Sequence, residues 1–181
     1  MTGTYDLYRR LSKRPLGPQV FSVLYALKAP YFWTVRPQVR AMAPHHAEVV
    51  VALRWAVRNH IGTLHAIAAV NGLEAAMGLL AEATCPEDKR WIPVGMTVRY
   101  VAKATTDLLC VADTDEADWE QDEVPVRVKA VRRDGVVAVE GVITIRTSDR
   151  PEGPAPTLIT TTRRLDGPMT RGSTDYHPLR G

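Results

Sequence analysis

The sequence predicts an α+β fold in which an antiparallel six-stranded sheet wraps around one long central helix. The run from Thr63 to Ala83 covers 21 residues, is predominantly apolar and contains no proline. A helix that is apolar on nearly all sides has to be buried. Extended segments flank this run, and Asp134-Gly135, a strong signal for a two-residue hairpin, joins the last two of them. Antiparallel strands around a buried helix account for all three observations.

Size and composition indicate one domain of ordinary soluble character. The chain has 181 residues, of which 45% are hydrophobic and 24% charged, and a domain usually spans roughly 100 to 200 residues. No unbroken apolar run approaches the ~20 residues of a membrane span, because polar residues interrupt the long helical run. The basic N-terminus does not resemble a secretory signal, so we expect a cytoplasmic protein. The formal charge of +3 comes without a block of lysines and arginines, which argues against nucleic-acid binding.

The two cysteines predict neither a metal site nor a disulfide framework. Cys85 and Cys110 show no CxxC spacing and have no neighbouring histidines. We interpret Cys110 as a buried thiol on a strand.

Residues 1–33 form a predicted helical extension. Helical spacing of apolar residues covers 4–14 and 19–28, with a break at Pro15, Gly17 and Pro18. The apolar stripe of the second helix, Val20, Phe21, Leu24 and Tyr25, favours packing on the core. A membrane-surface role is the alternative, but the polar face carries few cations.

Residues 34–147 form the predicted core domain, with the strand order of the hotdog fold. The expected strands are 34–42, 47–53, 95–104, 108–112, 124–131 and 136–147. We interpret His45 and His46 as solvated turn residues, 55–62 and 85–94 as loops, and the acidic segment 113–123 as a solvated loop without a metal. Strand 95–104 is a plausible sheet edge for pairing with a second copy, so we expect a homodimer or a dimer of dimers.

The last 34 residues, 148–181, form a predicted tail. They contain five prolines, four glycines and many threonines, and they lack the apolar residues for a core of their own.

Polar residues in the long helix mark a candidate site. On a 3.6-residue period, Asn71, Glu74, Gly78 and Glu82 share one stripe. Gly78 follows Glu74 by one turn and leaves space beside the carboxylate for a ligand. The structural alternative is an ion pair between Glu74 and an arginine such as Arg99.

His65 precedes Glu74 by nine residues, about half a turn out of phase, so the two cannot share one face of one helix. They can form one site only if His65 lies at the helix entrance, or if a dimer brings one chain's Glu74 to the other chain's entrance.

The spacing Asn59-x5-His65-x8-Glu74 resembles that of PaaI-like hotdog thioesterases. The segments RNHIGTLHAIA and KRWIPVGMTVRYVAKA are more similar still to a bacterial hotdog subfamily classed as a domain of unknown function. This resemblance covers roughly residues 20–147 and implies the hotdog fold.

The resemblance also implies roles in the hydrolysis of acyl thioesters. Glu74 would be the nucleophile or general base, and the N–H of Ala66 would polarise the carbonyl, which suits the unpaired donors at a helix N-terminus. Asn59 would orient the substrate or the water, and His65 would position the loop or contact the thioester. The other candidate substrate-binding residues are Gly62, Asn71 and Gly78, with Arg58, Lys89 and Arg90 for the phosphates of coenzyme A. No metal and no cofactor other than the coenzyme A part of the substrate is expected.

One departure bears on turnover. Many of these thioesterases have His-Gly-Gly where this chain has His65-Ala66-Ile67, and the two side chains narrow the space at the helix entrance. A thioesterase acting on acyl-CoA or acyl-carrier substrates is the leading hypothesis. A hotdog dehydratase or hydratase and a dimer that binds acyl groups or acyl-CoA without catalysis are the alternatives.

Overall fold

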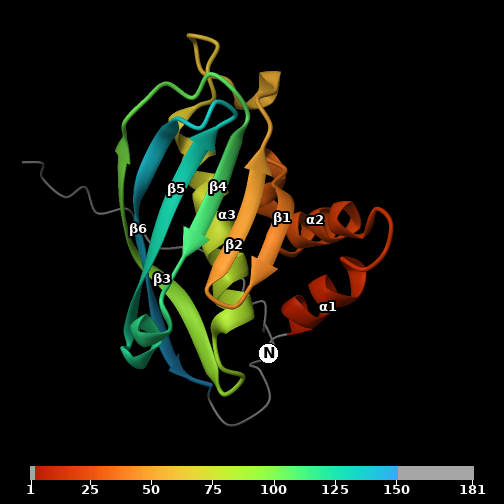
Figure 1. The fold of residues 1–181 in the computed structure, drawn as a ribbon, viewed down its shortest axis with the longest axis vertical. Helices are drawn as coiled ribbons and strands as arrows, with labels where there is room; N and C mark the ends of the chain where they lie inside the picture. Colours follow the sequence, from red (N-terminus) through yellow and green to blue (C-terminus); the bar gives the residue numbers. More distant parts are fainter. Residues whose placement is uncertain (1–2, 151–181) are drawn as a thin grey trace, which may run out of the picture. The chain divides into compact units, whose positions relative to one another are not determined.

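A computed structural model describes residues 3–150 of the chain (Figure 1). Its α-helices are α1 (Gly3–Leu11), α2 (Gly17–Lys28) and α3 (Ala66–Thr84), and its 3-10 helices are η1 (Pro30–Thr34), η2 (Trp55–Val57) and η3 (Glu116–Glu120). Its strands are β1 (Gln38–Ala43), β2 (His46–Val51), β3 (Lys89–Tyr100), β4 (Leu108–Asp113), β5 (Glu123–Arg132) and β6 (Val137–Asp149). The predicted tail lies outside the described residues from Pro151 onward.

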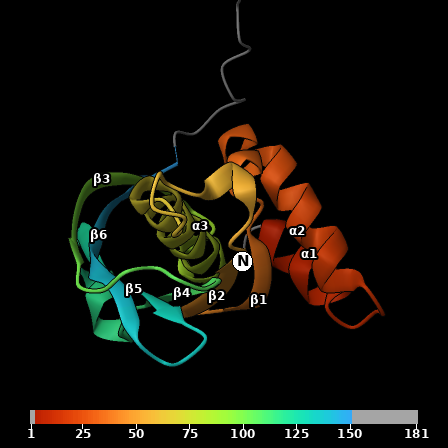
Figure 2. The same cartoon turned by 90° about the horizontal axis from the view of Figure 1, so that it is seen from above.

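The six strands form one antiparallel sheet in the order β1-β2-β4-β5-β6-β3. Seen from above, the sheet curls around α3, while α1 and α2 lie outside β1 (Figure 2). The predicted fold is therefore confirmed. β1 and β3 are the two edges of the sheet, as expected for the strand around Gly95.

Helix α3 supplies the centre of the core. Leu73, Leu79 and Leu80 are fully buried, and Gly72 allows the helix to approach the sheet. A Cβ atom at Gly72 would lie 2.7 Å from Sγ of Cys110, a fully buried thiol on β4, as predicted. By length and composition α3 could span a membrane, but 72% of its apolar window is buried inside the fold, as in the core helix of a soluble protein.

The long helix begins three residues later than predicted because the preceding residues are bound elsewhere. The Thr63 amide donates to Oδ1 of Asn59, and the Leu64 amide donates to the carbonyl of Ala104. His65, with extended φ and ψ of −63° and 139°, is the N-cap, so Ala66 is the first helical residue.

Strand β3 corrects the prediction of a loop at 85–94. It begins at Lys89 and ends at Tyr100, short of the expected Ala104. Pro93 lies within it, opposite Ile145 of β6. Proline is tolerated in edge strands, where one side of the backbone needs no partner. At the opposite edge β1 begins only at Gln38, because Pro30–Thr34 forms η1.

The packing face of α2 differs from the prediction. Phe21 and Tyr25 are buried, and Phe21 makes an edge contact with Tyr8 of α1 at 5.1 Å between ring centroids. Val20 and Leu24, which were expected on the same packing face, are 48% and 43% exposed. The helix therefore packs through a narrower stripe than its apolar residues suggest.

The histidines of the first hairpin turn are half-buried and bonded, which corrects their interpretation as solvated residues. Nδ1 of His45 lies 3.2 Å from Oγ1 of Thr114, and Nδ1 of His46 lies 2.7 Å from Oδ1 of Asp113. The acidic loop contains η3, and residues 3–150 hold no group of three or more His, Cys, Asp or Glu side chains arranged to bind a metal.

Candidate functional site

A small cavity lies at the N-terminus of α3, and we call it the entrance cavity. It has a volume of about 210 Å³ and is lined by residues from η1, η2 and the first turns of α3. Arg58, His65 and Asn71, three of the residues predicted to contact substrate, line it together.

Asn71 is 4% exposed and holds an unpaired acceptor. Its Nδ2 donates to Oγ1 of Thr34 at 3.3 Å, and the Thr34 hydroxyl donates to the carbonyl of Tyr31 at 2.8 Å. Because the hydroxyl proton is already used, Thr34 can only accept from Asn71, which fixes the orientation of the amide. Oδ1 of Asn71 then has no donor within residues 3–150. An unsatisfied buried acceptor is destabilising by about 1–3 kcal/mol.

The side chain of Asn59 organises the loop before the helix. Its Oδ1 accepts from the amides of Ile61 and Thr63, and its Nδ2 donates to Oγ1 of Thr63 at 2.8 Å. Gly62 has a φ of +82°, which favours glycine. Both residues therefore shape the loop, and direct contact with a substrate stays a prediction for each.

The first turn of α3 presents a free donor. Nδ1 of His65 accepts from the amide of Ile67 at 3.1 Å, which satisfies one of the initial N–H groups of the helix. No group in the described part of the chain accepts from the amide of Ala66. Ala66 and Ile67 are both exposed, so this N–H lies at the accessible, positive end of the helix.

Glu74 lies beside a second cavity, which we call the flank cavity. Its volume is about 280 Å³, and the α3 residues that line it are Glu74, Met77, Gly78 and Glu82. The predicted stripe is thus found on one side of the helix, except that Asn71 faces the entrance cavity instead. Most of the remaining lining is apolar and comes from α2 and its C-cap residue, from η1 and from β3: Tyr25, Ala29, Phe32, Trp91 and Pro93.

The carboxylate of Glu74 is half-buried and has no hydrogen bond or ion pair within residues 3–150. The alternative of a structural pair with Arg99 is wrong, because Nη1 of Arg99 lies 3.6 Å from Oε1 of Glu140 on the neighbouring strand. Burial, and to a smaller extent the negative charges of Glu82 and Glu74, raise the pKa of the Tyr25 hydroxyl, so Tyr25 stays neutral beside the cavity. A half-buried carboxylate that has no partner within residues 3–150 and lines an apolar cavity makes Glu74 a candidate functional group.

Glu74 and the Ala66 amide of one chain are too far apart to act on the same carbonyl group. Eight residues separate them along one helix, which corresponds to about 12 Å at 1.5 Å per residue. A donor and a base that attack one carbonyl both have to lie about 3 Å from it. A single chain therefore contains both predicted catalytic groups, Glu74 and the Ala66 amide, but does not bring them to one carbonyl.

The cations predicted to bind coenzyme A are also divided. Arg58 lies at the start of α3, whereas Lys89 begins β3, five residues after the last residue of that helix. Arg90 donates from Nε to Oγ of Ser148 at 3.0 Å. Lys89 and Arg90 thus lie at the opposite end of the helix from Arg58 within one chain.

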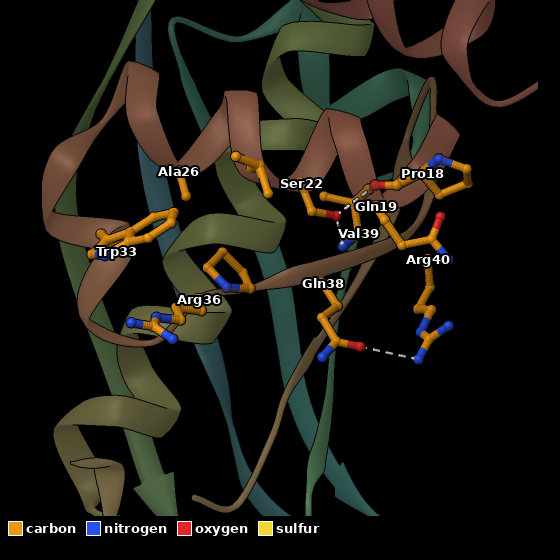
Figure 3. A pocket seen from close by; sticks show the side chains of 11 residues that line it. Pro18, Gln19, Ser22, Ala26, Trp33, Arg36, Gln38, Val39 and Arg40 are labelled. Atoms are coloured by element: carbon orange, nitrogen blue, oxygen red, sulfur yellow. Dashed lines mark hydrogen bonds between the residues drawn. The ribbon is translucent and has the colours of Figure 1, made fainter. Parts of the chain in front are cut away.

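A third cavity, of about 440 Å³, is lined by residues of α2, β1 and the segment between them (Figure 3). Trp33, Arg36 and Arg40 line it, and the guanidinium of Arg36 lies 5.1 Å from the ring centroid of Trp33. Ser22 at its floor is satisfied, since it donates to the carbonyl of Pro18 and accepts from the amide of Val39. None of the predicted site residues lines this cavity.

Sequence reasoning missed the aromatic lining of the flank cavity. Tyr25 and Phe32 lie in the N-terminal extension, and Trp91 lies in a segment predicted as a loop. The sequence pointed to this lining only through the glycine at position 78. In the structure a Cβ atom there would lie 2.9 Å from Oη of Tyr25 and 3.5 Å from Cη2 of Trp91. The glycine indicated a close neighbour but not which residue it would be.

Comparison with solved structures supports the architecture. The protein solved as genomics APC5556 shares 38% identity with this chain at a TM-score of 0.72, over 81% of this chain and 99% of that one. A Pseudomonas aeruginosa protein of unknown function, PA5026, described as a probable thioesterase, shares 17% identity at a TM-score of 0.64, over 74% and 97% of the two chains. A thioesterase family protein from Silicibacter pomeroyi shares 17% identity at 0.62, over 71% and 96%.

Comparison by sequence identifies the family. The family model described as "Domain of unknown function (DUF4442)" matches residues 17–147, which is most of the chain. No curated protein matches. The chain therefore belongs to the DUF4442 family, and its antiparallel sheet around a central helix is the hotdog fold that solved thioesterase family proteins share.

Proposed function

We propose that the protein is a thioesterase that hydrolyses acyl-CoA or acyl-carrier thioesters at a site shared between two copies of the chain. The observation that carries this proposal is Glu74, a half-buried carboxylate that lies beside an apolar cavity and has no partner in the described part of the chain. The resemblance of Asn59, His65 and Glu74 to the thioesterase spacing supports the same reaction.

The shared site follows from the distance between the two catalytic halves. Antiparallel pairing of two β3 edges reverses the direction of the second α3, so the partner's helix entrance approaches the middle of the first helix, where Glu74 lies. Each dimer then contains two equivalent sites, each with Glu74 of one chain and the Ala66 amide of the other. This arrangement fulfils the second of the two conditions under which His65 and Glu74 can cooperate.

The side chains of β3 support such a pairing. Val98 packs on the core. Met96 and Tyr100, two residues before and after it, lie on the same face of the strand and are 39% and 53% exposed. Trp55, Ile61 and Ile67 around the helix entrance are also exposed, by 88%, 57% and 55%. Exposed apolar groups at a free strand edge are typical of an interface. The same pairing moves the partner's Lys89 and Arg90 toward the first chain's entrance, beside Arg58, where they could bind phosphates.

In the reaction, Glu74 removes a proton from water as the water oxygen bonds to the thioester carbon, or Glu74 attacks that carbon directly. The Ala66 amide of the other chain stabilises the oxyanion. In the first route the C–S bond of the tetrahedral intermediate breaks, the thiolate takes the proton that Glu74 removed, and the acyl group leaves as a carboxylic acid. In the second route the C–S bond breaks to leave a mixed anhydride between the acyl group and Glu74. A water molecule then cleaves this anhydride, and its two protons pass to the thiolate and to the released carboxylate. A general base contributes about 10²- to 10⁴-fold to the rate, and one oxyanion donor about 10²- to 10³-fold.

The test is thiol release from a panel of acyl-CoA substrates by wild type and Glu74→Gln. Glutamine keeps the size of the side chain but removes its basicity, so we expect a rate loss of at least about 10²-fold at unchanged melting temperature. Glu140→Gln, on the outer part of the sheet, is the matched control. Full activity of Glu74→Gln would contradict the assignment.

The second candidate is a dimer that binds acyl groups or acyl-CoA without hydrolysis. The side chains of Ala66 and Ile67 at the exposed helix start favour it, because they narrow the approach to the Ala66 amide. Tight binding of acyl-CoA with no thiol release from any substrate would favour this candidate.

A further inference from the structure

We propose that the N-terminal extension sets the length of the acyl chain, and that the ion pair between Lys28 and Glu82 closes the far end of the acyl pocket. The pocket is the flank cavity, and its substrates are medium-chain acyl thioesters of about ten carbon atoms. This inference rests on the proposed function, because it assumes that the thioester carbonyl lies at Glu74.

The flank cavity follows one side of α3 from the carboxylate to the ion pair. Glu74, Gly78 and Glu82 line it in steps of one helical turn. The eight residues from Glu74 to Glu82 correspond to about 12 Å along the helix. An extended chain advances roughly 1.2 Å per bond, so this length holds about ten bonds.

The walls of the cavity suit a hydrocarbon chain. The rings of Tyr25 and Phe32 are stacked at 5.3 Å between centroids, and Trp91 lies across from them on β3. The Tyr25 hydroxyl donates to the carbonyl of Ala75 at 3.1 Å, so its polar group is already paired. Gly78 keeps the middle of the cavity open, because a side chain there would meet Tyr25 and Trp91.

Lys28 stands between this cavity and another one. Its Nζ lies 3.8 Å from Oε1 of Glu82 and donates to Oγ1 of Thr4 at 2.7 Å, so Lys28 connects α2 with both α3 and α1. Beyond it lies a cavity of about 440 Å³ with Leu7, Phe21 and Leu24 in its lining. The two cavities share Tyr25, Lys28 and Glu82.

An acyl chain longer than the flank cavity has to displace this ion pair. An apolar chain that passes between the two charged groups removes water and the Lys28 ammonium from the Glu82 carboxylate, whose side chain is only 19% exposed, and this further desolvation of a charge is unfavourable. Without the lysine side chain, the same chain could continue into the space beside Leu7 and Leu24. Lys28 is therefore a specificity-determining residue, and it touches the end of the acyl chain only.

The experiment measures kcat/KM with the series from butyryl-CoA to palmitoyl-CoA for wild type, Lys28→Ala, Gly78→Ala and the control Lys13→Ala, an exposed lysine of the same extension. For wild type we expect a rise of about fourfold per methylene up to decanoyl-CoA and a fall beyond it. Lys28→Ala should move the optimum to myristoyl-CoA or palmitoyl-CoA. Gly78→Ala should move it to butyryl-CoA or hexanoyl-CoA, and Lys13→Ala should leave it unchanged.

Binding of non-hydrolysable S-alkyl-CoA thioethers, measured by calorimetry on the same variants, separates this inference from the proposed function. A chain-length limit that Lys28→Ala relaxes supports the inference even if no thioester is hydrolysed. Hydrolysis with a profile that neither Lys28→Ala nor Gly78→Ala shifts would overturn it and leave the thioesterase intact. Melting temperatures identify a variant that does not fold, and Lys28→Ala, at a largely exposed side chain, keeps the test independent of Gly78→Ala.

Discussion

Replacement of Ala66 by proline tests the proposed oxyanion donor with little disturbance of the fold. A backbone N–H cannot be removed by any other natural residue, and proline is favoured at the first position of a helix. His65, the preceding residue, has φ −63° and ψ 139°, which is the extended conformation that a following proline requires. The Ala66 amide also donates to no group within residues 3–150, so no hydrogen bond of the described fold is lost.

The expected effects on rate and stability therefore differ strongly. Loss of one oxyanion donor raises the activation free energy by about 2.7–4 kcal/mol, which lowers kcat by about 10²- to 10³-fold. The free energy of unfolding should change by less than about 1 kcal/mol, because proline at this position fits the existing backbone. The assays are thiol release from acyl-CoA and thermal denaturation of the same preparations.

Ala66→Gly is the matched control, because it keeps the N–H and removes only the methyl group. It restores one glycine of the related thioesterases, so its rate should equal or exceed that of wild type. Ala66→Pro with wild-type kcat and an unchanged melting temperature would refute the assignment of this amide. An equal loss of activity in both variants would refute it too, since only one of them lacks the donor.

Three further predictions concern the pairing of two chains, a buried acceptor without a donor, and the pH dependence of stability. Met96→Asp should yield a monomer of 20.0 kDa in light scattering, with loss of activity but no large fall in melting temperature. The reason is that the side chain is exposed in a single chain and would be buried in the proposed dimer. A dimeric Met96→Asp, or a monomeric wild type, would contradict the proposed interface. Asn71→Leu removes the buried Oδ1 that has no donor within residues 3–150, so it should raise the free energy of unfolding by about 1 kcal/mol while it lowers activity. Chemical denaturation measures the first effect and the thiol assay the second. Destabilisation would mean that Oδ1 accepts a hydrogen bond in the folded protein. A hydrogen bond from the Leu53 amide and, next in size, the guanidinium of Arg133 hold the pKa of Asp107 below its usual value of 3.8. The ionised carboxylate therefore stabilises the fold above about pH 4, and this stabilisation is lost as the pH falls below that value. Asp107→Asn should therefore be less stable than wild type at neutral pH, and the difference should shrink as the pH falls below the usual carboxyl range. A difference that is constant with pH would show that the carboxylate charge has no part in it.

The sequence by itself was sufficient to predict the architecture, because buried helices and strands require apolar residues at characteristic spacings along the chain. The apolar run around Leu73 required a buried helix, and alternation in the flanking segments required strands. The boundaries were less well determined. Lys89 to Val94 seemed a loop by composition, yet pairing with β6 makes it a strand. Ladder hydrogen bonds to a distant segment decide such cases, and no local pattern records them.

The candidate site divides in the same way. Spacing along one helix placed Glu74, Gly78 and Glu82 on one side of α3, since that relation is local and periodic. Only the tertiary structure decided what lies opposite them, because the positions of Tyr25 and Trp91 depend on how α2 and β3 pack. It also decided that Glu74 has no partner among residues 3–150, since Arg99 pairs with Glu140 instead. Contacts between segments far apart in sequence are set by packing of the whole fold, whereas the helix repeat is set by the backbone alone.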